Sequence, residues 1–369
     1  MFTSTALKIT GLAALTLFAR PAPTSTPSPD SVQRVATLGM ARSVHTATAL
    51  LSGEVVVIGG MANDGGSLAS AELFDPARNT LRAVGRLAVP RASHTATRLR
   101  DGRVLVAGGY NGDYLSSVEV FDPATNRFRS AGSLLLGRSG QTATLLADGT
   151  VLFVGGVGQG WTFLKSAEVF DPATGTSRLV GALAVPRESH TATLLPSGDV
   201  LIVGGHSGRR EAMEVYASAE LYSPRTGQFS PVGSLATARH KHDAVALADG
   251  RVLVLGGADR TDRRDYASTE VFDSRTNRFA RGPAMIHARY KIAGTSMLLR
   301  DGNVLVSAGG TAAEILDVGR WAFREVPGRF PAAFRFAATA PLPGGDVMIS
   351  GGYAAGVTHN DGVWRYRTK

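Results

Sequence analysis

The chain of 369 residues contains no cysteine, and several other common features are missing as well. Without cysteine the chain can form no disulfide and cannot have a lipid-anchored export signal. The absence of cysteine is nevertheless compatible with a protein of the cell envelope. The apolar stretch at residues 9–19 is too short to span a bilayer. We find no nucleophile elbow, phosphate loop, helical metal motif or EF-hand pattern, because the glycine-rich stretches lead into strands and never into helices.

Glycine, by contrast, is abundant and periodic. The 44 glycines include seven Gly-Gly pairs spaced by about 50 residues, each closing an apolar run and each followed by a variable loop; they begin at Gly59, Gly108, Gly155, Gly204, Gly256, Gly309 and Gly351. A period of this length is typical of a four-stranded propeller blade. The sequence therefore predicts an all-β, seven-bladed propeller that forms a single domain over residues 32–369.

Turn residues divide each repeat into four strands, which we name A to D. In repeat two the predicted strands cover residues 91–97, 103–107, 117–121 and 127–130. Asp-Gly or a close variant joins A to B, and Asp-Pro joins C to D in the first three repeats. Strand A is rich in Ala and Thr, so we expect it to be innermost, where only small side chains fit.

The two ends of the repeat array are complementary. Residues 32–42 match residues 81–91, so the array begins with a D strand, and it ends after a C strand at 363–366. We expect the first strand to complete the last blade and to leave no open sheet edge. Ahead of it, we interpret residues 1–20 as a signal peptide and residues 21–31 as a linker rich in Pro, Ser and Thr, the alternative being a frayed tail. This interpretation predicts an extracytoplasmic protein, either periplasmic or secreted.

The recurring motifs resemble those of a known family. The glycine doublet, the Glu-Val-Phe-Asp-Pro segment and an aromatic residue in strand D (Phe128, Phe229 and Phe279) recur in this order. Over nearly all of residues 32–369 the chain resembles a kelch-repeat β-propeller of the bacterial exported kind, although Phe or Leu replaces the family's usual Trp and repeats six and seven are degenerate. Copper-radical oxidases built on this fold need a cysteine crosslinked to tyrosine, so that subfamily is excluded and we expect no cofactor.

One arginine before strand A and one glutamate in strand C recur together in six repeats. We expect them to form structural pairs through bidentate hydrogen bonds, with ligand contact by the arginines as the alternative. The pairs are Arg42 and Glu72, Arg91 and Glu119, Arg138 and Glu168, Arg187 and Glu220, Arg239 and Glu270, and Arg289 and Glu314.

The segments before strand A and the loops after Gly-Gly share one face of the disc, which we call the loop face and expect to bind the ligand. Its candidate residues are a ring position (His45, His94, Gln141, His190, His242, then Ile292 and Phe336) and Tyr110, Asn111, Trp161, His206, Arg209, His240, Arg263 and Tyr266. The histidines are open to two interpretations: they hold neighbouring loops together, or they bind ligand and transfer protons. We expect no metal site, because a metal–imidazole bond of about 2 Å cannot gather a whole ring of side chains.

A net charge of +9 and a pI of about 10.1 favour anionic ligands. The charge is dispersed and no nucleic-acid motif is present, so we do not expect nucleic acid as a partner. Two functions stay open: a monomeric module that binds a protein or carbohydrate, and a carbohydrate-active enzyme resembling the kelch-type sialic acid epimerases. In those epimerases, which have six repeats, arginine would hold a carboxylate and histidine or glutamate would act as acid and base.

Overall fold

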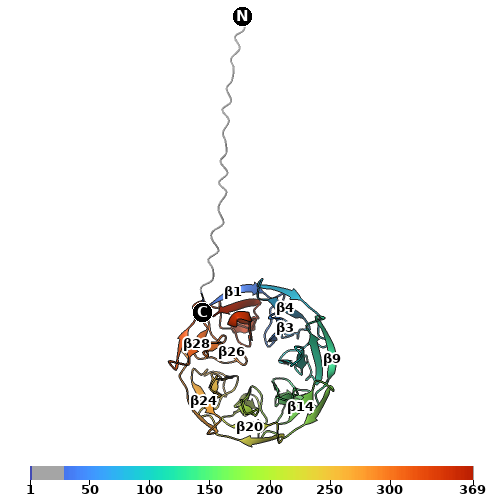
Figure 1. Cartoon of the computed structure of the whole chain (residues 1–369), viewed down its shortest axis with the longest axis vertical. Helices are drawn as coiled ribbons and strands as arrows, with labels where there is room; N and C mark the ends of the chain where they lie inside the picture. Colours follow the sequence, from blue (N-terminus) through green and yellow to red (C-terminus); the bar gives the residue numbers. More distant parts are fainter. Residues whose placement is uncertain (2–28, 369) are drawn as a thin grey trace.

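The computed structural model describes Met1 and residues 29–368, so the predicted signal peptide after Met1 and linker residues 21–28 lie outside the described part of the chain. In the described part, seven four-stranded antiparallel sheets surround a central opening (Figure 1). Helical structure there is confined to four single 3-10 turns, and no helix has the length and hydropathy needed to cross a membrane. The predicted all-β, seven-bladed propeller is therefore confirmed.

Each blade runs from an inner strand A to an outer strand D. Blade 1 consists of β2 (Thr46–Ala49), β3 (Val55–Ile58), β4 (Ala71–Asp75) and β5 (Thr80–Ala83), and blade 2 of β6 (Thr95–Arg98), β7 (Val104–Ala107), β8 (Ser117–Asp122) and β9 (Arg127–Ser133). Blade 3 consists of β10 (Thr142–Leu145), β11 (Val151–Val154), β14 (Ala167–Asp171) and β15 (Thr176–Leu179), and blade 4 of β16 (Thr191–Leu194), β17 (Val200–Val203), β20 (Ala219–Ser223) and β21 (Gln228–Pro231). Two short hairpins, β12–β13 (Val157–Gly158 and Thr162–Phe163) and β18–β19 (His206–Ser207 and Glu214–Val215), extend the loops of blades 3 and 4.

The last three blades follow the same order, with one exception in the seventh. They consist of β22 (Asp243–Ala246), β23 (Val252–Leu255), β24 (Thr269–Asp273) and β25 (Arg278–Arg281); β26 (Ser296–Leu298), β27 (Val304–Val306), β28 (Glu314–Asp317) and β29 (Ala322–Glu325); and β30 (Ala338–Pro341), β31 (Val347–Ser350) and β32 (Gly362–Arg367) with the N-terminal β1 (Ser31–Thr37) as the fourth strand.

The N-terminal strand closes the ring as predicted. β1 pairs antiparallel with β32, with Val32 opposite Tyr366, and Figure 1 shows the blue and red ends of the chain side by side. Val32 is buried with Trp364 in a core shared by blades 6 and 7. Because the first strand supplies the outer edge of the last blade, separating the ring requires breaking both a hydrogen-bonded ladder and an apolar contact.

Strand A is innermost but shorter than predicted. In repeat two it starts at Thr95 rather than Arg91, because Ser93 has a φ of 52° in the left-handed region and interrupts the extended chain. Inner strands of successive blades lie next to one another, for example β2 beside β6 and β30. The small Ala and Thr side chains allow this close approach.

The core consists of seven apolar clusters, most of them between neighbouring blades. Strand B is buried on both faces in every blade, as in β7 (Val104–Ala107). One cluster packs Val56 and Ile58 of blade 1 against Val106 and Phe121 of blade 2. Burying each such side chain stabilises the fold by about 1.5–3 kcal/mol, so blade-to-blade contact holds the ring together.

The glycine pair that ends strand B fits a close backbone approach. Gly60 has a φ of 102°, and a Cβ there would lie 2.7 Å from the Ser43 carbonyl oxygen. A side chain at this position would collide with the segment that leads into strand A. The doublet thus brings the loop after strand B against the start of strand A on the loop face.

Candidate functional site

The six recurring arginines are completely buried and act as hubs within each blade. In blade 3, Arg138 donates to Glu168 at 2.6 Å and to the carbonyl oxygens of Gly155 and Ser166. The second carboxylate oxygen of Glu168 accepts the Leu135 N–H at 2.6 Å. All six predicted partners lie within ion-pair distance: Arg42 and Glu72, Arg91 and Glu119, Arg138 and Glu168, Arg187 and Glu220, Arg239 and Glu270, and Arg289 and Glu314.

The predicted bidentate geometry is wrong, however. Each carboxylate divides its two oxygens between the arginine and a backbone N–H of the segment before strand A, as Glu72 does with Arg42 and Gly39. In the first five blades the arginine donates from its other terminal nitrogen to the carbonyl of the first glycine in the doublet, Gly59 in blade 1, and in blade 6 it donates to the Ala308 carbonyl instead. Arginine and glutamate therefore join three segments of a blade, and the buried guanidinium groups are not available to a ligand.

The histidines at the ring position connect neighbouring blades. His94 Nε2 lies 3.0 Å from Thr46 Oγ1 of blade 1, and His190 contacts Thr142 in the same way at 3.1 Å. His242 contacts Thr191 at 3.2 Å, and His45 contacts Ser350 across the closure at 3.0 Å. In blade 3, Gln141 takes this position and donates to the Ala107 carbonyl at 3.0 Å.

Burial keeps these ring histidines neutral. It lowers the pKa of His94 and of His190 to about 3, with the nearby arginines adding to the effect. The ring position contains Ile292 in blade 6, as predicted, but Phe336 does not belong to it in blade 7. Ala337 packs against Gly352 where the other blades place the ring residue, and Phe336 is the left-handed residue before it, with a φ of 50°.

The residue before each ring position has a positive φ in all seven blades. These residues are Val44, Ser93, Gly140, Ser189, Lys241, Lys291 and Phe336, with φ between 46° and 65°. At most junctions the N–H of one donates to the carbonyl of its counterpart in the preceding blade, as Ser93 does to Val44 at 3.0 Å. We call this circle of hydrogen bonds the belt. It surrounds the mouth of the central channel on the loop face.

The belt encloses a cavity of about 230 Å³ whose wall includes one carboxyl group, that of Glu188. Burial raises the pKa of Glu188 to about 7, against the opposing charges of Arg209 and Lys241. Its side chain crosses Gly140, where a Cβ would lie 2.8 Å from Glu188 Oε1. The mouth therefore contains a half-buried carboxyl that exchanges its proton near neutral pH.

A chain of polar side chains lies beside the mouth. His206 Nδ1 is 3.2 Å from His240 Nδ1, and His240 Nε2 lies 3.0 Å from Asp262 Oδ1. Lys241 donates to the other oxygen of Asp262 at 2.5 Å. Burial and the neighbouring charges of His240 and Lys241 lower the pKa of His206 to about 3. Burial opposes the ionisation of Asp262, but hydrogen bonds from His240 and Lys241 outweigh it and lower its pKa.

Three aromatic rings and one arginine form a platform near Glu188. Tyr114 packs at 5.2 Å from Tyr110 and edge-on at 5.7 Å from Trp161, between ring centroids. The guanidinium carbon of Arg209 lies 3.2 Å from the centre of the Trp161 ring. Trp161 is 50% exposed, although it is a large aromatic side chain. We call Tyr110, Tyr114, Trp161 and Arg209 the aromatic platform.

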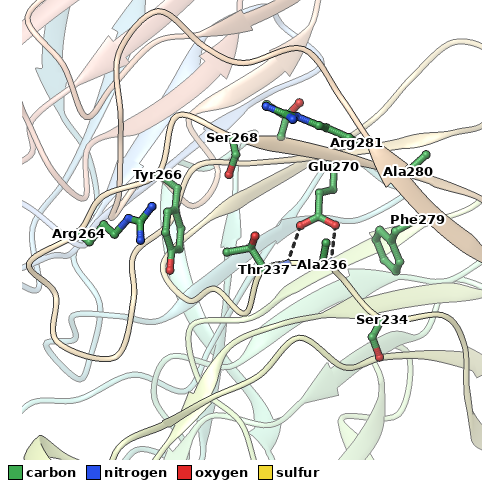
Figure 2. Close-up of a pocket in the computed structure, with 11 residues that line it drawn as sticks. Ser234, Ala236, Thr237, Arg264, Tyr266, Ser268, Glu270, Phe279, Ala280 and Arg281 are labelled. Atoms are coloured by element: carbon green, nitrogen blue, oxygen red, sulfur yellow. Dashed lines mark hydrogen bonds between the residues drawn. The ribbon is translucent and has the colours of Figure 1, made fainter.

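The remaining predicted residues do not join these groups. Asn111 and Arg263 are exposed in loops, and Tyr266 packs against Arg239 and lines a different cavity of about 560 Å³ beside blade 5. Figure 2 shows that the carboxylate of this cavity, Glu270, accepts hydrogen bonds from the Ala236 and Thr237 backbone. That carboxylate belongs to a structural hub, so the smaller cavity at the mouth is the better candidate.

Two members of the site were missed from the sequence, Glu188 and Tyr114. A signal was available for Glu188, because the same repeat position contains Ser43, Ala92 and Ser139 in the first three blades. From blade 4 onward the position has the large polar residues Glu188, His240, Tyr290 and Arg335, so a change from small to large side chains marks this part of the ring. Tyr114 lies in a loop whose length varies between repeats, so repeat alignment gave no sign of it.

Comparison with known proteins agrees with this architecture. Residues 91–135 match the family model for the Kelch motif. Mouse Kelch-like protein 36 is 35% identical over 88 residues, which are 23% of this chain and 14% of that relative. The chain is a β-propeller with a Kelch motif. A fungal alcohol oxidase in complex with copper has a similar fold, with a TM-score of 0.71 and 13% identity over 91% of this chain and 75% of the oxidase.

The kelch propeller fold serves interaction modules and enzymes alike, so function depends on the site. The copper chemistry of the oxidase finds no matching donor set in this propeller. The chain has no cysteine, and among the described residues no group of three or more His, Asp or Glu side chains is arranged to hold a metal ion.

Proposed function

We propose that this kelch propeller is a recognition module that binds a carbohydrate on its loop face, across the aromatic platform and the neighbouring mouth. The observation that carries the proposal is the half-exposed Trp161, supported by two tyrosines and stacked on Arg209. An aromatic ring held rigidly at a surface offers apolar contact without loss of side-chain freedom. The polar mouth beside it suits a ligand with an apolar face and hydroxyl edges.

Size favours a carbohydrate over a protein partner at this position. The mouth cavity of about 230 Å³ admits one small polar ring and is lined by Glu188, Gln141 and Ser189. A protein partner would instead need a broad apolar area around an aromatic anchor. The net positive charge of the chain also favours glycans whose acidic groups would lie at the rim of the binding site.

The test is a glycan-binding screen of the purified full chain, followed by calorimetry with the best ligand. Trp161→Ala is expected to weaken binding by about tenfold or more, as removal of an aromatic anchor does. The control is Leu51→Ala, which removes a side chain that is 71% exposed in the turn between β2 and β3, on the opposite face. Absence of any glycan ligand, or equal binding by Trp161→Ala, would refute the proposal.

A carbohydrate-active enzyme is the second candidate, and a specific observation favours it. Glu188 exchanges its proton near pH 7 beside Arg209, which can pair with a sugar carboxylate. An enzyme resembling the kelch-type sialic acid epimerases would interconvert the anomers of an acidic sugar. Proton NMR of N-acetylneuraminate with and without the protein measures that rate. Equal rates with and without the protein would rule out this enzyme activity and leave the recognition module as the proposed function.

The same proposal places the protein outside the cytoplasm, because Lys8 and a short apolar stretch precede a linker rich in Pro, Ser and Thr. We expect a mature form without about the first 20 residues in the periplasmic or culture fraction. Fractionation followed by mass spectrometry of the N-terminus measures this. A cytoplasmic protein that keeps Met1 would contradict it. Size-exclusion chromatography with light scattering is expected to give a monomer.

A further inference from the structure

The belt is interrupted at one junction, between blades 3 and 4. At the six other junctions the N–H of each left-handed residue donates to the preceding blade, as Gly140 does to Ser93 and Lys241 to Ser189. Among the described residues, no such bond joins the Ser189 N–H to the Gly140 carbonyl. One backbone donor and one backbone acceptor therefore stay free at the mouth.

One side chain at the same junction is also without a partner in the cavity. Glu188 lies across Gly140 and makes no side-chain hydrogen bond with any described residue. Gly140, Glu188 and Ser189 all line the mouth cavity. We call this set the notch.

We propose that the notch binds a sugar ring through two adjacent neutral hydroxyl groups, an inference that rests on the proposed carbohydrate recognition. The notch presents two acceptors, Glu188 and the Gly140 carbonyl, and one donor, the Ser189 N–H. A hydroxyl both donates and accepts, so a pair of them can satisfy such a set. Unpaired buried polar groups are unfavourable, which gives the ligand a free-energy advantage over apolar molecules.

The charges around the notch select against ionic ligand groups. An ammonium group at the notch would meet two like charges, those of Arg209 and Lys241, and a carboxylate beside Glu188 would meet one, whereas a hydroxyl group would meet none. Tyr114 also lies close to Glu188, and His190 and His206 are neutral near pH 7 because of their lowered pKa values. A neutral hydroxyl group is therefore compatible with all of these neighbours.

The structure offers a substitution that disturbs the notch without altering its backbone. Gly140 has a φ of 65°, a conformation that Ser93 and Ser189 adopt at the equivalent positions, so alanine can keep this backbone conformation at the cost of some strain. Its Cβ would lie 2.8 Å from Glu188 Oε1 and would displace the carboxyl group. Ser139→Ala is the matched control for Glu188→Gln, because Ser139 occupies the position of Glu188 in blade 3.

The experiment is calorimetry of the full chain with cellotriose, a neutral trisaccharide, and with trigalacturonate of the same length. We expect cellotriose to bind, Glu188→Gln and Gly140→Ala to weaken it by about tenfold, and Ser139→Ala to change it by less than about twofold. Cellotriose affinity of the unmodified protein should increase from pH 6 to pH 8 as the carboxylate forms, and Glu188→Gln should abolish that change. Matching near-UV circular dichroism confirms that each variant is folded.

The possible failures are distinguishable. If Trp161→Ala weakens cellotriose binding but Glu188→Gln and Gly140→Ala do not, the notch assignment is wrong and the proposed function stands. If trigalacturonate binds tighter than cellotriose and Glu188→Gln strengthens it further, the notch is an anion site and the inference is overturned. If neither trisaccharide binds, the inference is overturned, and if the glycan screen also finds no ligand, the proposed function is refuted with it.

Discussion

Removing one glutamate from a buried hub should destabilise the whole ring. In blade 3, the side chains of Arg138 and Glu168 are both fully buried and 2.6 Å apart. Glu168→Ala leaves the guanidinium charge with only carbonyl and hydroxyl partners and deprives the Leu135 N–H of its acceptor. Stranding a buried charge in this way costs about 3–5 kcal/mol. Domains have a total stability of about 5–15 kcal/mol, so the loss should be large.

Urea unfolding followed by far-UV circular dichroism measures the effect as a lower midpoint. The control is Glu54→Ala, because Glu54 and Arg82 form a surface pair at 3.4 Å with side chains 29% and 53% exposed, which contributes about 0–1 kcal/mol. The double variant Arg138→Met with Glu168→Leu should lose less than the sum of the single losses, because no charge is left unpaired. Equal midpoints for Glu168→Ala and Glu54→Ala would refute the hub interpretation.

Three other perturbations test the ring. Deleting residues 31–37 removes β1, so the melting temperature should fall and all blades should lose protection, and unchanged melting would contradict closure. The pKa of His94 falls from 6.5 to about 3 on folding, so the unfolded chain binds more protons and the folded state loses stability as the pH drops below about 6.5. His94→Gln introduces the residue that blade 3 has at this position and should reduce this loss of stability, as measured by thermal melts between pH 7 and pH 4. Asp243→Ala should cost about 3 kcal/mol, because the carboxyl group accepts three backbone N–H groups at the start of blade 6, and faster hydrogen exchange in β26 (Ser296–Leu298) should follow.

The fold was predictable because each repeat encodes it independently. Glycine doublets, Asp-Gly turns and the apolar runs of strand B agree in most blades, and the match of residues 32–42 to 81–91 identified the closing strand. The pairing of arginine with glutamate could also be predicted, since the two residues disappear together in the seventh repeat.

The site was less predictable because it depends on departures from the repeat. Glu188 and Gln141 differ from their counterparts in other blades, and only the three-dimensional ring brings them to one cavity. The platform joins Tyr110, Trp161 and Arg209 from the loops of three successive blades, and loop conformation follows from contacts that repeat alignment does not contain. Phe336 was misplaced by one residue for the same reason, in a degenerate repeat.

Hydrogen exchange with and without the best carbohydrate ligand tests whether the loop face near the junction of blades 3 and 4 is the binding surface. We expect slower exchange at residues 139–142, 157–163 and 187–190, and unchanged exchange at the turns between strands A and B, such as 101–102 and 148–149, on the opposite face. Protection confined to those turns, or to the cavity beside blade 5, would contradict it.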